Sequence, residues 1–251
     1  MAYRHDADLA FLGELSNENL GKLFDLLVYD PKDNQRRRTE ELTDSKEYHQ
    51  HQNNYAQYWQ RIAEELQLFG GNTFFNMLRK QGILYNEILC DVCDKMKVKY
   101  NKNAETVIIE QSLLMSLLEK ALEEMSHPEQ EELAKSIGIQ DFGHVDASIL
   151  TATFLKLFNM GKFGAYKGTL IIVNAVWKAL FGKGLTLVAN ATLMRAISIL
   201  TGPIGWGITG IWTAVDIAGP AYRVTIPSVL MVALLRQTYL NEDVLTDLES
   251  N

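Results

Sequence analysis

A stretch of twenty consecutive residues without a charged side chain, residues 196–215 (AISILTGPIGWGITGIWTAV), constrains the fold of this chain most strongly. Twenty residues is about the length that crosses the hydrocarbon core of a bilayer as an α-helix. Proline removes a backbone donor, however, and each glycine costs a helix roughly 1 kcal/mol relative to alanine. Because Pro203 lies among four glycines, we expect two helices that meet at residues 201–205 in a tight hairpin or a kink, rather than one unbroken helix.

Two interpretations of this stretch stay open. In the first, it is a central helical element that is apolar all round because neighbouring helices cover it. In the second, it enters or lies on a membrane, with lysine and arginine side chains reaching toward anionic headgroups. The residues expected to contact the membrane or a partner are the large apolar ones, namely Ile204, Trp206, Ile208, Ile211 and Trp212.

Charge divides the chain into contrasting parts. Residues 1–146 carry a net charge of −10, residues 147–240 carry +7, and the tail 241–251 carries −4, which gives −7 for the whole chain. Such asymmetry indicates that the two halves pack on each other, that an anionic surface is a partner, or both. The basic residues are spread singly through apolar sequence, which argues against a nucleic-acid partner.

Helical periodicity precedes the basic region, most clearly in residues 104–125, and no run alternates as a strand would. We therefore predict an all-α protein, in which an acidic amphipathic helical bundle is followed by a basic, glycine-rich apolar helical hairpin region. The expected parts are a short N-terminal helical module and linker (1–44), the acidic bundle (45–146), the basic apolar region (147–240) and an acidic tail (241–251).

Asp216 is the only acidic residue among the ninety-four residues of the basic region. A buried carboxylate is costly unless it is paired. The available partners are Arg223 and Arg195, so we predict a buried ion pair that fixes the register of the apolar helices. A functional acid or a pH sensor is the alternative.

Motifs for catalysis or cofactor binding are absent from the sequence. Cys90 and Cys93 form a C-x-x-C without a second pair, and His49 and His51 do not complete a metal site. There is no P-loop, no G-x-S-x-G and no H-E-x-x-H. We expect no catalytic, cofactor-binding or metal-binding residues, and no enzyme activity.

Three segments carry a family resemblance. Residues 65–98 (ELQLFGGNTFFNMLRKQGILYNEILCDVCDKMKV) resemble the central block of the YaaW-like family of bacterial proteins, which is grouped with the ubiquinol–cytochrome c chaperone superfamily. The opening YRHDADLAFLGELSNENLGKLFDLLVYD resembles the short module that precedes this block. The stretch GPIGWGITGIWTAVDIAGPAYRVTIPSVLMVALLRQ is similar to the family's C-terminal region. The resemblance implies a helical fold and a bacterial source, and it transfers no catalytic residues.

The favoured hypothesis is a non-enzymatic protein that holds a membrane-interacting apolar hairpin in a shielded soluble form. The acidic half would cover the basic half until a partner, low pH or anionic lipid releases it. The alternative is an assembly chaperone or interaction protein resembling the ubiquinol–cytochrome c chaperones. Expected partners are an anionic membrane surface or a membrane-protein client, and a homo-oligomer is a further expectation. The first residues contain no secretory signal, so the expected location is the cytoplasm, with a peripheral or inserted position at the inner membrane as the alternative.

Overall fold

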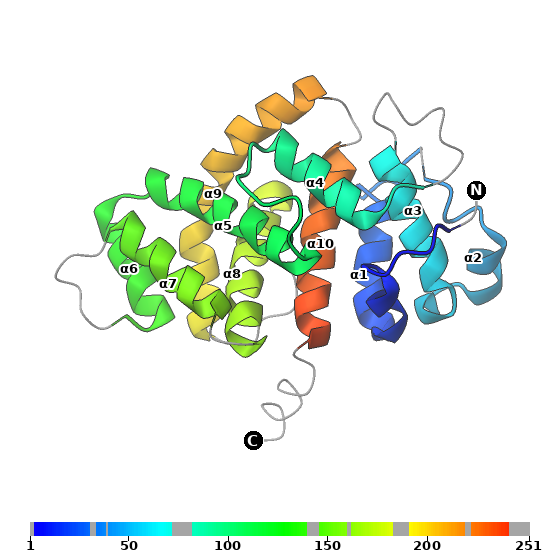
Figure 1. Cartoon of the computed structure of the whole chain (residues 1–251), viewed down its shortest axis with the longest axis horizontal. Helices are drawn as coiled ribbons and strands as arrows, with labels where there is room; N and C mark the ends of the chain where they lie inside the picture. Colours follow the sequence, from blue (N-terminus) through cyan, green and yellow to red (C-terminus); the bar gives the residue numbers. More distant parts are fainter. Residues whose placement is uncertain are drawn as a thin grey trace, which may run out of the picture.

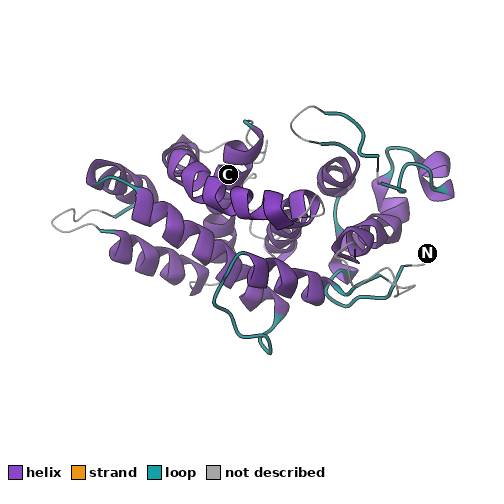
Figure 2. Ribbon diagram, turned by 90° about the horizontal axis from the view of Figure 1, so that it is seen from above, coloured by secondary structure: helices purple, strands orange, loops and turns teal. Residues whose placement is uncertain are grey.

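The fold comes from a computed structural model, which describes residues 3–30, 34–38, 40–71, 82–139, 146–159, 162–182, 191–218 and 222–240. Within these residues the chain forms ten α-helices and two 3-10 helices, and Figure 2 shows helices joined by loops with no strand between them. The predicted all-α class is therefore confirmed.

The α-helices fall in the order shown in Figure 1: α1 (Asn17–Val28), α2 (Lys46–His51), α3 (Trp59–Gly71), α4 (Tyr85–Lys95), α5 (Thr106–Glu124), α6 (His127–Ile137), α7 (Ala147–Asn159), α8 (Lys162–Phe181), α9 (Ala191–Ala218) and α10 (Tyr222–Leu240). The 3-10 helices are η1 (Ala10–Glu14) and η2 (Tyr55–Tyr58).

Local sequence explains where several of these helices begin and end. The Ser16 hydroxyl accepts a hydrogen bond from the Asn19 N–H at 3.3 Å, which caps the start of α1. At the start of α6 the backbone N–H of Ser126 donates to the Glu129 carboxylate at 2.8 Å. Gly138 ends α6 with a φ of 93°, in the left-handed region that glycine adopts without steric cost.

Two glycines allow the N-terminal helices to pack closely against η2 and α3. A Cβ added at Gly13 would lie 2.9 Å from the Trp59 ring, and one added at Gly21 would lie 2.9 Å from the Tyr55 ring. A larger residue at either position would push an aromatic side chain out of the core. The first two helical elements, η1 and α1, therefore pack in close contact with α3 and η2.

The last helix, α10, lies in the middle of the molecule. Figure 1 places it between α1 and α8, and it contacts α1, α3, α4, α5 and α8. Most of its side chains are buried on every face, which explains why its sequence shows no amphipathic period. The end of the basic region therefore packs against the N-terminal module as well as against the acidic helices. The expected boundaries at residues 44, 146 and 240 stay predictions.

The chain is helical throughout residues 191–218, so of the two alternatives expected at residues 201–205 the tight hairpin is wrong, and a kink within one helix agrees with the structure (Figure 1). Pro203 lies inside α9, and Figure 1 shows that α9 changes direction between its yellow and its orange part, as a proline inside a helix commonly causes. The Thr201 hydroxyl donates to the Ile197 carbonyl at 2.6 Å, an interaction that also bends helices. Packing against α5, α6 and α8 outweighs the unfavourable helix propensity of this segment.

Candidate functional site

One side of α9 belongs to the core, while Met194 and Arg195 are exposed. Ile204 is 1% exposed, and Ala196, Ile197 and Leu200 are also buried. The side chains of the other residues expected to contact a membrane or partner lie outside the described residues, so that expectation stays a prediction: Trp206, Ile208, Ile211 and Trp212. No helix in the described part of the chain has both the length and the apolar character that crossing a membrane requires.

The partners expected for Asp216 lie apart from each other. Arg195 is exposed at the start of α9 and pairs with Glu132 of α6 at 2.8 Å. Arg195 and Asp216 stand on the same helix, twenty-one residues apart, which corresponds to roughly 30 Å at 1.5 Å per residue. An ion pair between those two residues therefore does not fit α9. Arg223 lies exposed in the first turn of α10; the Asp216 side chain is outside the described residues, and its pairing with Arg223 stays a prediction.

A buried ion pair that the sequence analysis missed joins α5 to α10. The Arg236 Nε donates to both oxygens of the Glu110 carboxylate, at 3.2 and 3.0 Å. The Tyr85 hydroxyl donates to the same carboxylate at 2.7 Å, and the guanidinium group lies 4.5 Å from the centre of the Phe11 ring. The Glu110 and Arg236 side chains are only 2% and 12% exposed. Four elements, η1, α4, α5 and α10, meet at this cluster.

Burial raises the pKa of Glu110, and the positive charge of Arg236 opposes that shift. Burial and the neighbouring Glu110 carboxylate likewise raise the pKa of the Tyr85 hydroxyl. The cluster is closed off from solvent, so no substrate reaches it in this conformation. Its geometry fits a structural role, which is to hold α10 at a fixed register against α5.

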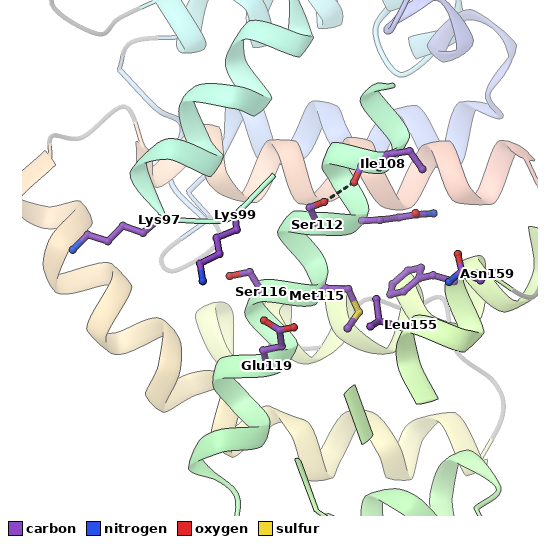
Figure 3. Close-up of a pocket in the computed structure, with 11 residues that line it drawn as sticks. Lys97, Lys99, Ile108, Ser112, Met115, Ser116, Glu119, Leu155 and Asn159 are labelled. Carbon is purple, nitrogen blue, oxygen red and sulfur yellow. Dashed lines mark hydrogen bonds between the residues drawn. The ribbon is translucent and has the colours of Figure 1, made fainter. Parts of the chain in front are cut away.

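An open groove of about 630 Å³ lies over the outer face of α5. Its floor is formed by α5 residues that recur every three or four positions and so share one side of the helix: Ile108, Ser112, Met115, Ser116 and Glu119. Figure 3 shows Leu155 and Asn159 of α7 on one side of α5 and Lys97 and Lys99 on the other. Ile108 and Leu155, which both line this groove, are large apolar side chains that are 47% and 44% exposed.

The polar groups of this groove do not form a catalytic pair. The Ser112 hydroxyl donates to the Ile108 carbonyl of its own helix at 2.9 Å rather than to a base. In the described part of the chain, no group of three or more His, Cys, Asp or Glu side chains could hold a metal ion. Burial also raises the pKa of the Cys93 thiol to about 12, so that it is protonated near neutral pH and a poor metal ligand.

The fold and the groove together define a class of protein: an all-α protein with an open groove between α5 and α7 that is lined by both apolar and polar side chains. The model of the ubiquinol-cytochrome C chaperone family matches residues 54–230, and the model of a domain of unknown function (DUF3944) matches residues 3–38. A UPF0174 protein of Helicobacter pylori (strain J99 / ATCC 700824) is 50% identical over 236 residues, which are 94% of this chain and 93% of the relative. The UPF0174 protein YaaW of Escherichia coli (strain K12) is 34% identical over 242 residues, 94% of this chain and 95% of the relative. No solved structure is significantly similar.

The chain therefore belongs to the YaaW-like UPF0174 family, within the ubiquinol-cytochrome C chaperone superfamily. This confirms the resemblance seen in its sequence motifs.

Proposed function

We propose that this protein is a non-catalytic, chaperone-like binding protein that holds an apolar segment of a client protein in the groove between α5 and α7. The observation that carries the proposal is that the large apolar side chains of Ile108 and Leu155 line the groove and are both nearly half exposed. The match to the model of a chaperone family supports a chaperone-like role for the family as a whole.

Burial of this surface would give a weak, reversible complex. The apolar surface that a client would cover is small, because seven of the eleven residues that line the groove are polar or charged, so the hydrophobic gain at about 25 cal/mol per Å² is modest. Association itself costs about 4–15 kcal/mol in lost freedom of motion. The expected dissociation constant is therefore micromolar or weaker, which suits a protein that must release its client.

Site-specific photo-crosslinking in bacterial cells tests the proposal. A photoreactive residue replaces either Leu155, inside the groove, or Ile149, which is also exposed on α7 but does not line the groove. We expect a client protein that is crosslinked from position 155 and not from position 149. Adding Ile108→Ser should reduce the crosslinked product at least tenfold, while Met194→Ser, at another exposed apolar side chain, should leave it unchanged.

The groove substitutions should leave the fold intact because both side chains are already exposed, so the melting temperatures should stay within about 3 °C of the parent protein. Equal crosslinking from positions 155 and 149, or a product that survives Ile108→Ser, would show that the groove is not the binding surface.

A second candidate function is the shielding of the apolar region by the acidic half. One observation favours it: two cations of the basic region, Arg195 and Arg236, pair with acidic residues of the first half, Glu132 and Glu110. If these pairs keep the basic region closed, binding to anionic liposomes should increase as the pH falls from 7 to 5 and carboxylates take up protons. Binding that stays constant over this range would remove this candidate.

A further inference from the structure

The groove carries two lysines on one side and apolar side chains of α5 and α7 on the other, and this restricts what can bind in it. We propose that the groove selects amphipathic helices with an acidic flank, whose carboxylates lie against Lys97 and Lys99. This inference rests on the proposed function, because it names the class of client segment that the same groove would take.

The shape of the groove matches a helix. Its floor runs along α5 from Ile108 to Glu119, which is roughly 16 Å or three helical turns. Leu155, Phe158 and Asn159 of α7 line one side of this floor, and Figure 3 shows Leu155 and Asn159 beside α5. Two neighbouring helices leave a furrow into which the side-chain ridge of a third helix packs. A client helix with apolar residues at positions i, i+4, i+7 and i+11 would fill three turns of this furrow.

The opposite side of the groove carries two lysines in a fixed place. Val98 is buried between them and anchors the segment, and its N–H donates to the Cys93 carbonyl at 2.9 Å. Lys97 adopts a φ of 57° directly after α4, a position that ends a helix in the left-handed conformation. The backbone of this segment therefore sets where both lysine side chains leave the surface.

Neither lysine has an ion-pair partner among the residues that the structure describes. The contrast with nearby Lys102 is clear, because its ammonium group pairs with Asp94 at 2.9 Å. Glu119 is the only acidic side chain that lines the groove, so the lining carries a net positive charge. A carboxylate on the flank of a bound helix would supply the missing partner, whereas a basic flank would be repelled.

The size of this preference follows from the exposure of the lysines. Two solvent-exposed ion pairs strengthen binding by about five- to tenfold at low salt, and the gain shrinks at high ionic strength because salt screens exposed charges. The apolar side chains of the groove set the affinity that all amphipathic helices share, and the two lysines select among these helices by the charge of their flanks.

The experiment uses three synthetic helical peptides with the same apolar stripe, flanked by Glu, by Gln or by Lys residues. Their binding to the full-length protein is measured by fluorescence anisotropy. We expect the Glu peptide to bind five- to tenfold more tightly than the Gln peptide, and the Lys peptide to bind most weakly. The preference should disappear in Lys97→Gln/Lys99→Gln and persist in Lys102→Gln, the matched control outside the groove.

The outcomes separate this inference from the proposed function. If all three peptides bind with equal affinity and Leu155→Ser abolishes that binding, the charge selection is wrong and the proposed function stands. If no peptide binds, or if binding survives Leu155→Ser, both are overturned.

The acidic tail of this chain, which contains Val244 and Leu248 between acidic residues, is a competing occupant. If Asp243→Asn/Asp247→Asn/Glu249→Gln in the full-length protein raises the affinity for the Glu peptide at least threefold, the groove belongs to the tail, and its assignment to a client helix is overturned.

Discussion

Arg236→Met tests how strongly the buried ion pair fastens α10 to the rest of the molecule. Methionine keeps most of the apolar stem of arginine but leaves the Glu110 carboxylate, which is 2% exposed, with only the Tyr85 hydroxyl as a hydrogen-bond partner. Removing one member of a buried ion pair costs about 3–5 kcal/mol, because the other charge stays buried without compensation. For a chain of this size that corresponds to a fall of roughly 10 °C in the melting temperature, measured by circular dichroism at 222 nm.

Arg195→Met is the matched control. Arg195 also joins the basic region to an acidic helix, but it and Glu132 are 65% and 46% exposed. Exposed ion pairs contribute less than about 1 kcal/mol, so this variant should melt within about 3 °C of the parent protein. The double variant Glu110→Gln/Arg236→Met should recover at least half of the loss, since glutamine carries no charge and still accepts the hydrogen bond from Tyr85.

The loss in Arg236→Met should also depend on pH. Burial raises the pKa of Glu110, and without the arginine no positive charge opposes that shift. A carboxyl group with a raised pKa in the folded state favours folding at pH values below its unfolded pKa, and this contribution is lost as the pH rises through the folded value. The variant should therefore be closer to the parent protein at pH 5 than at pH 8. Melting within 2 °C of the parent at pH 8, or a double variant no more stable than Arg236→Met, would refute the reasoning.

Three further predictions concern stability and reactivity. Burial raises the pKa of Glu65 to about 7, so the stability of the protein should fall as the pH rises through 7. Glu65→Gln should remove this dependence and stabilise the protein at pH 8 by up to about 3 kcal/mol, at about 1.4 kcal/mol per pKa unit. The variant and the parent protein should melt alike at pH 4, and an unchanged melting curve at pH 8 would contradict the prediction. Gly21→Ala should destabilise by about 1–3 kcal/mol because the new methyl group would lie 2.9 Å from a tyrosine ring. Gly205→Ala, whose new methyl group would lie 3.6 Å from the Ala179 Cβ in ordinary van der Waals contact, should stabilise by up to about 1 kcal/mol. Thermal melts should rank these two glycine variants in that order. A thiol reagent at pH 8 should modify the half-buried Cys90 and spare Cys93, because burial raises the pKa of the Cys93 thiol to about 12. Rapid modification of both cysteines in the folded protein would contradict this.

The helices themselves could be predicted because their signals are local. Ser16 caps α1 through its own side chain, and Gly138 ends α6 through its own backbone conformation. Neither feature depends on residues far away in the sequence. The apolar periodicity of residues 104–125 likewise predicted α5, which spans Thr106–Glu124. The all-α class follows from such segments alone.

Local propensity left the course of α9 open between a tight hairpin and a kink, and it did not predict that the chain stays helical on both sides of Pro203. Pro203 and the glycines around it disfavour a helix in isolation, yet the chain stays helical because α5, α6 and α8 pack against it. The ion pair between Glu110 and Arg236 was missed for a similar reason. Its members are separated by 126 positions in the sequence, and nothing near either residue indicates the other. Only the position of α10 in the centre of the molecule brings them together.

The groove could not be predicted from the sequence, because α5 carries apolar residues on more than one face. Ile108 has the same apolar character as the core residues of the helix, although it shares one side of α5 with Ser112, Ser116 and Glu119. The structure buries Ile109 and Leu113 and leaves Ile108 half exposed. Which apolar residues of such a helix stay exposed depends on how many neighbours the fold supplies, and that number is a property of the whole chain.

The ion pair of Glu110 and the groove over Ile108 both involve α5, and substitutions can test them separately, which makes the proposed function testable. Glu110 follows Ile108 by two residues, or about 200° around the helix axis, so the ion pair faces α10 while the groove faces outward. Arg236→Met should therefore lower stability and leave the groove lining unchanged, whereas Leu155→Ser should reduce client binding and leave stability unchanged. If both variants lowered binding in proportion to their loss of stability, binding would report the folded fraction alone. A loss of binding at an unchanged melting temperature is the result that assigns the groove a function of its own.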